Sequence, residues 1–168
     1  MLKKIVSLSA AIFVLGNTVA SAENAPIIGN VESKCTVQTV RQGVYVQPSP
    51  GTLTTDTAAG GVLPRIRYDV ALADYYIARV GWPQSFSSSP SLTDVVTWDG
   101  NVEVDQVTET GMSAYESNKV QYDNITEFDL TIAGTVWFKV SSEANYGYDK
   151  SLPGGRYTAV VTAECIAK

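Results

Sequence analysis

The chain has 168 residues, with 12 basic, 17 acidic and no histidine side chains, and a formal net charge of −5. This acidic balance disfavours binding to nucleic acid or to anionic lipid surfaces, because both require clustered cations. The lack of histidine removes the commonest general base, the commonest zinc ligand and the usual pH switch.

A secretory signal peptide is the first predicted element, over residues 1–22. The Lys3-Lys4 pair precedes an apolar run from Ile5 to Val19, and Ala20-Ser21-Ala22 supplies the small residues of a cleavage site. The apolar run is too short to span a bilayer, and polar residues interrupt it. We therefore expect an exported mature chain over residues 23–168, a length that suits one domain and contains no transmembrane segment.

Cys35 and Cys165 are the only two cysteines, and they stand near opposite ends of the mature chain. Export to an oxidising compartment predicts a disulfide between them, with two free thiols as the alternative. A bridge requires Cα atoms within about 7 Å of each other. The first and last strands must then be neighbours or face each other.

The first half of the mature chain predicts three strands and two loops. Residues 31–40 alternate, with Val31, Ser33, Cys35 and Val37 on one face. A loop rich in Pro, Gly and Thr covers residues 47–61. Two strands follow, over residues 62–71 and 74–82, joined by a tight turn near Ala73-Asp74. Residues 83–94 predict a second loop.

The second half predicts two hairpins and a terminal strand. Asp99-Gly100 lies between two β-rich runs, as is typical of a type I′ hairpin turn. Residues 110–124 are ambiguous and could hold one helical turn. Another hairpin is predicted to turn at Ala133-Gly134, a loop covers residues 143–155, and one strand closes the chain. This series predicts a single all-β domain, an antiparallel β-sandwich of immunoglobulin-like type, with a jelly roll as the alternative.

No catalytic or metal site emerges from the sequence, and no cofactor is expected. Carboxylates and an amide stand at every second position from Asp99 to Asp105, but the spacing differs from a calcium-binding EF-hand loop. Nucleophilic motifs are absent, and seventeen acids single out no catalytic pair. Tyr146 and Tyr148 are the aromatic residues that we expect to be exposed, where they could stack on a sugar.

The two ends of the mature chain resemble exported pilin subunits of chaperone–usher fibres. The resemblance rests on the signal peptide, on the alternating stretch "IIGNVESKCTV", and on a final alternating strand introduced by Gly155, fourteenth from the C-terminus. It implies an incomplete immunoglobulin-like domain completed by the N-terminal segment of the next subunit. Ile27, Gly29 and Val31 would be the inward residues of that donor strand.

This chain departs from the family's pattern in its penultimate residue, in its disulfide, and in the twelve residues that precede Cys35 in the mature chain, which are few for a donor extension as well as a first strand. Ala167 stands where an aromatic residue is usual, and the family's disulfide usually joins two early strands. We nevertheless expect a non-enzymatic structural fibre subunit, with copies of itself as partners and with a periplasmic chaperone and an outer-membrane usher as assembly factors. It would pass through the periplasm to the cell surface or an extracellular fibre. The alternative is a self-contained secreted sandwich that binds a carbohydrate or surface ligand.

Overall fold

A computed structural model describes residues 34–168 of the chain. The predicted signal peptide lies outside the described residues. So do Ile27, Gly29 and Val31 of the predicted donor segment. No helix within the described part has the length and apolar character needed to cross a membrane.

The described chain is built mainly from β-strands, as its alternating sequence predicts. The strands in chain order are β1 (Cys35–Arg41), β2 (Val46–Ser49), β3 (Thr52–Thr54), β4 (Arg65–Val70), β5 (Tyr76–Gly81), β6 (Phe86–Ser88), β7 (Val96–Val107), β8 (Val120–Tyr122), β9 (Ile125–Leu130), β10 (Gly134–Tyr146), β11 (Thr158–Ala159) and β12 (Thr162–Ala167). A 3-10 turn (Thr110–Ala114) and α1 (Tyr115–Asn118) lie between β7 and β8, where the sequence allows a helical turn.

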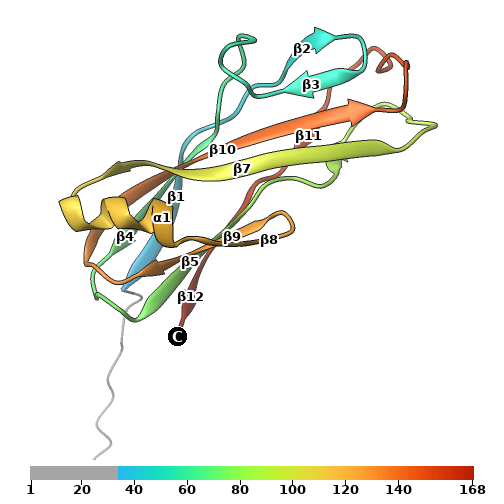
Figure 1. The fold of residues 1–168 in the computed structure, drawn as a ribbon. Coiled ribbons are helices and arrows are strands. Elements are labelled where there is room, and N and C mark those ends of the chain that lie inside the picture. The colour runs from blue at the N-terminus through green and yellow to red at the C-terminus, as the bar shows by residue number, and fades with distance from the viewer. Residues whose placement is uncertain (1–33) are drawn as a thin grey trace, which may run out of the picture. The chain divides into compact units, whose positions relative to one another are not determined.

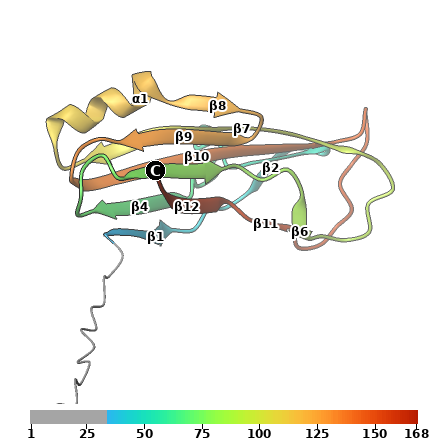
Figure 2. The same ribbon diagram turned by 90° about the horizontal axis from the view of Figure 1, so that it is seen from below.

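The strands form two main antiparallel sheets, and the predicted all-β sandwich is confirmed (Figures 1 and 2). The first sheet has the order β1-β4-β10-β3-β2, with β7 paired along the other side of β10. The second has the order β12-β5-β9-β8, and β6 pairs with β11 in a separate ribbon.

Alternating side chains on the central strands make the core. Buried and half-buried residues alternate along β4 and along β10, as expected for strands with one face toward the other sheet. Phe138 on β10 is fully buried, and its ring centroid lies 5.4 Å from that of Tyr68 and 4.3 Å from that of Phe128. These three aromatics connect β4 and β10 of one sheet with β9 of the other.

The hairpin predicted at Asp99-Gly100 is wrong. β7 continues through these residues and pairs with β10 from Val96–Tyr146 to Val107–Val136. A Cβ atom at Gly100 would lie 2.6 Å from Cγ of Trp82 and 2.6 Å from the carbonyl oxygen of Ser141. Glycine is therefore required here by a close side-chain and backbone approach, and not by a turn.

Two other connections also differ from the prediction, because consecutive strands enter different sheets. Ala133-Gly134 joins β9 of the second sheet to β10 of the first, so these strands form no hairpin. The single terminal strand predicted from the alternation is divided into β11, which pairs with β6, and β12, which pairs with β5. Alternation reports which residues face inward, but it does not report the pairing partner.

Replacing Gly100 by alanine is expected to lower the free energy of unfolding by about 1–3 kcal/mol, because the new methyl group displaces the Trp82 ring or the β10 backbone. Urea unfolding followed by tryptophan fluorescence measures this change. Gly154→Ala is the matched control, since a Cβ atom there meets no atom within 4 Å. Equal stability of the two variants would contradict the packing explanation.

Candidate functional site: the open edge of the sandwich

The first and last strands are both edge strands, and they lie side by side (Figures 1 and 2). Among the described residues, β1 pairs with β4 alone and β12 pairs with β5 alone. No strand of the described chain pairs with the other edge of either one. An edge strand presents unpaired N–H and C=O groups, which makes it a template for another strand.

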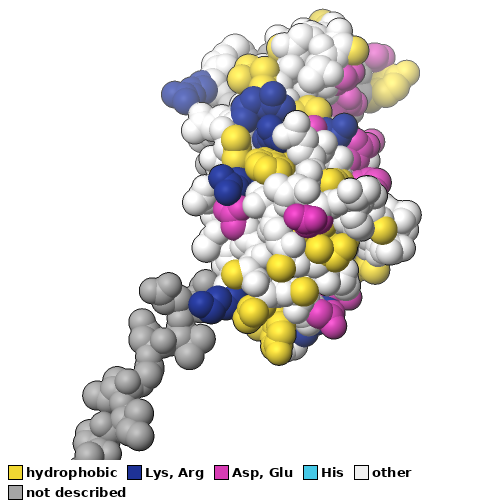
Figure 3. All heavy atoms as spheres, turned by 90° about the vertical axis from the view of Figure 1, so that its left-hand side faces the viewer, with side chains coloured by type: hydrophobic (Ala, Val, Ile, Leu, Met, Phe, Trp, Pro, Cys, Tyr) yellow, Lys and Arg dark blue, Asp and Glu magenta, His cyan; other side chains and the backbone are white. Residues whose placement is uncertain are grey.

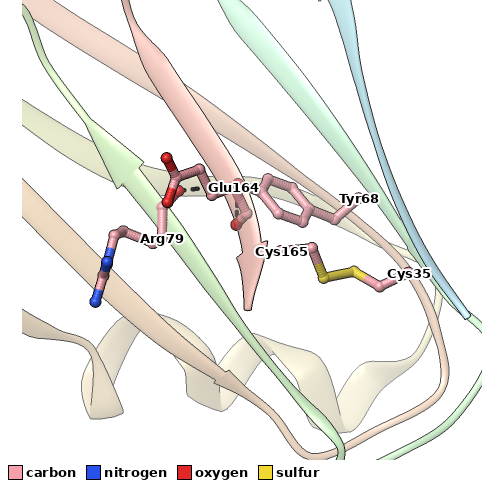
Figure 4. The surroundings of a disulfide bond; sticks show 5 residues. All are labelled: Cys35, Tyr68, Arg79, Glu164 and Cys165. Atoms are coloured by element: carbon pink, nitrogen blue, oxygen red, sulfur yellow. Dashed lines mark hydrogen bonds between the residues drawn. A yellow bond between two sulfur atoms is a disulfide. The ribbon is translucent and has the colours of Figure 1, made fainter. Parts of the chain in front are cut away.

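A disulfide joins these strands at one end, and the predicted Cys35–Cys165 bridge is confirmed. The two Cα atoms are 6.3 Å apart. Tyr68 of β4 lies beside the bridge, and its hydroxyl donates to the carbonyl oxygens of Arg79 and Glu164, 3.1 Å from each (Figure 4). Burial raises the pKa of Tyr68 well above its usual range, so this hydroxyl stays protonated and keeps both contacts.

Farther along the same strands, a groove of about 570 Å³ opens between the sheets. We call it the β1–β12 groove. One side includes Thr39 of β1, Val44 after it and Ile66 of β4. The other side is the stretch from Arg156 to Val161, continued by Ala163 of β12.

The surroundings of the β1–β12 groove are apolar although they face solvent. Val40, Val44 and Val160 expose 50%, 52% and 60% of their surface. Val161 and Ala163, which belong to the inward face of the predicted terminal strand, are only half-buried. Hydrophobic residues gathered beside an unpaired strand edge favour an interaction site.

The polar groups inside the groove are neutral. The Tyr45 hydroxyl and Ser142 Oγ lie 2.7 Å apart in a hydrogen bond, and burial raises the pKa of Tyr45. Among the described residues that line the groove, Arg156 carries the charge, and it is exposed. This environment suits an uncharged segment of polypeptide better than an ion or a charged metabolite.

On the opposite side of the first sheet, side chains cover part of the free edge of β7. Glu116 of α1 accepts a hydrogen bond from the backbone N–H of Val104, with 2.8 Å between N and Oε2. Lys119 donates from Nζ to the carbonyl oxygen of Val102 at 2.8 Å, and it also pairs with Glu116. Side chains thus occupy backbone groups on the free edge of β7 that another strand would need. Charged side chains and a covering helix are two ways in which proteins protect strand edges.

The alternating acidic residues of β7 form no metal site. Glu103 pairs with Lys139 at 3.0 Å and Asp105 with Arg65 at 2.7 Å, and the Lys139 contact lowers the pKa of Glu103. Across the described residues, no cluster of three or more histidine, cysteine or acidic side chains could hold a metal ion. Basic, acidic and hydrophobic side chains are interspersed on the face in Figure 3, in a pattern typical of a solvated surface.

The tyrosines predicted to be exposed together do not form a pair. Tyr148 exposes 90% of its surface, but Tyr146 exposes only 4%. The expectation for Tyr146 is wrong, because the alternation of β10 directs its ring inward, where its hydroxyl bonds with Thr93 at 3.1 Å. A two-ring sugar platform therefore does not exist at these residues.

The sequence does not reveal the covered β7 edge, since Glu116 and Lys119 read as an ordinary i,i+3 charge pair. The clearest signal that sequence reasoning could have used is the presence of valine at positions 40, 44 and 160, beside the groove. Comparison of the chain with models of protein families, with curated proteins and with solved structures gives no match.

Proposed function

We propose that the protein is a non-enzymatic structural subunit of a surface or extracellular fibre, and that a strand from a neighbouring copy fills its β1–β12 groove. The observation that carries this proposal is the difference between the β7 edge and the edges of β1 and β12. At β7, Glu116 of α1 and Lys119, which follows it, bind two backbone groups that a strand would use. At β1 and β12, both strand edges lack a described strand partner and border an apolar groove.

The occupant that we propose is the N-terminal segment of the mature chain, residues 23–33. Ile27, Gly29 and Val31 alternate within it, so a strand would direct them to one face. These three residues are uncharged, as is the interior of the groove. Main-chain hydrogen bonds to β1 or β12 would supply affinity, and the groove would receive the alternate side chains.

The resemblance to chaperone–usher pilins leads to the same proposal from the sequence. It implies export through the periplasm, with a chaperone that covers the groove until assembly and an outer-membrane usher. This supports copies of the same chain as the main partners.

Deleting residues 23–30 is expected to abolish polymerisation and to leave the fold intact, because the groove would have no donor. Size-exclusion chromatography with light scattering measures assembly, and circular dichroism with urea unfolding measures the fold. A synthetic peptide of residues 23–33 should bind the deletion variant. A stable monomer before deletion, combined with a large loss of stability after it, would instead indicate a closed domain.

A further inference from the structure

The disulfide closes one end of the β1–β12 groove to an added strand. Neighbouring strands lie about 4.7–4.9 Å apart, so a strand between β1 and β12 needs its flanking strands roughly 9–10 Å apart. The Cα atoms of Cys35 and Cys165 are only 6.3 Å apart. An inserted strand must therefore end before the bridge and lie beside the part of the groove that includes Thr39, Val161 and Ala163.

The chain's own N-terminal segment joins the domain at this closed end. Lys34 immediately precedes Cys35, and its carbonyl oxygen accepts a hydrogen bond from the backbone N–H of Ala71 at 2.7 Å. The contact between β1 and the end of β4 thus extends to Lys34. To enter its own groove, the preceding segment would have to reverse direction at Lys34 and take the place beside Cys35 where the bridge holds Cys165.

Length does not prevent such a self-insertion. Extended chain covers about 3.3–3.6 Å per residue, so residues 23–33 could span roughly 36 Å. β1, from Cys35 to Arg41, covers about 20 Å at the rise of a strand. Without the bridge, the segment could fold back along the free edge of β1 and fill the groove of its own molecule.

We infer that the Cys35–Cys165 disulfide excludes the chain's own N-terminal segment from the β1–β12 groove and so reserves the groove for a second copy. This inference rests on the proposed function, and it specifies which molecule supplies the strand. A segment from another copy is not tied to Lys34 of the receiving domain. It can enter from the end of the groove that is remote from the bridge.

The test uses four mature proteins, with and without residues 23–30, and with the disulfide or with Cys35→Ala/Cys165→Ala. A fluorescent peptide of residues 23–33 is titrated into each by anisotropy, at protein concentrations below self-association. We expect the oxidised full-length chain and the oxidised deletion variant to bind it within twofold of each other. In the disulfide-free pair, the full-length chain should bind at least tenfold more weakly than its deletion variant, because a tethered segment competes at a high effective concentration.

The possible results separate this inference from the proposed function. Peptide binding by none of the four proteins overturns the proposed function. Binding that is tenfold weaker for the oxidised full-length chain than for its deletion variant overturns the inference alone, because the segment would then reach its own groove despite the bridge. Equal affinities in the folded disulfide-free pair overturn it as well. If the disulfide-free proteins do not fold, the oxidised pair still overturns the inference when its two affinities differ tenfold.

Discussion

The Cys35→Ala/Cys165→Ala variant is expected to lose about 4–5 kcal/mol of unfolding free energy relative to the oxidised protein. The bridge spans 130 residues of sequence, and in the chain-entropy model a cross-link over a loop of this length gives a stabilisation of that size. It joins two edge strands at the two ends of the described domain, where chains usually fray. Since the total free energy of unfolding of single domains is about 5–15 kcal/mol, the variant should be partly unfolded near 37 °C.

Guanidinium unfolding at 10 °C and 25 °C, followed by far-UV circular dichroism, measures this loss. Reduction of the unmodified protein is the control, because it removes the cross-link while both cysteine side chains remain. The reduced protein should lose nearly as much stability as the variant. A loss below 1 kcal/mol in both would show that the bridge does not stabilise the closed end of the groove.

Residue types and their alternation predict which face of a strand is apolar better than they predict which strand it pairs with. The inward residues of β4 and of the first part of β10, up to Val140, could be identified from the sequence, because a strand with one buried face alternates apolar and polar side chains. The disulfide could be predicted as well, since two cysteines in an exported chain allow one intramolecular pairing.

Long-range packing explains the predictions that failed. Asp99-Gly100 has the composition of a hairpin turn, but its glycine makes room for Trp82, which is distant in the sequence. Tyr146 precedes a glycine in a polar stretch, yet it is the last inward residue of β10. Neither the approach of Trp82 nor the length of β10 can be derived from a short window of sequence.

The candidate site depends on topology in the same way. β1 and β12 become the two sides of a groove only because the first and last strands end at the same edge of the sandwich. The sequence predicts that they are close, through the cysteines, but it does not predict that their outer edges have no partner among the described strands. It also gives no sign that α1 and Lys119 protect β7, and this protection distinguishes the β7 edge from the edges of β1 and β12.

Ala163→Asp is expected to weaken strand uptake more than 100-fold and to leave the isolated subunit folded. Ala163 lines the groove and is half-buried in the free subunit, so a carboxylate there keeps contact with water. An inserted strand would cover it, and burying an unpaired carboxylate costs several kcal/mol. Each tenfold loss of affinity corresponds to 1.4 kcal/mol, so a loss of more than 100-fold follows.

The matched control is Thr162→Asp, which adds the same charge to the neighbouring residue of β12. Thr162 is exposed and does not line the groove, so this variant should assemble and bind the peptide of residues 23–33 within a few-fold of the unmodified chain. Light scattering measures assembly, and circular dichroism verifies that both variants fold. If both variants assembled equally well, the occupied surface could not be the inner face of β12 at Ala163. If Ala163→Asp alone lost assembly and peptide binding, the added strand would lie beside that residue, in the part of the groove that the disulfide leaves open.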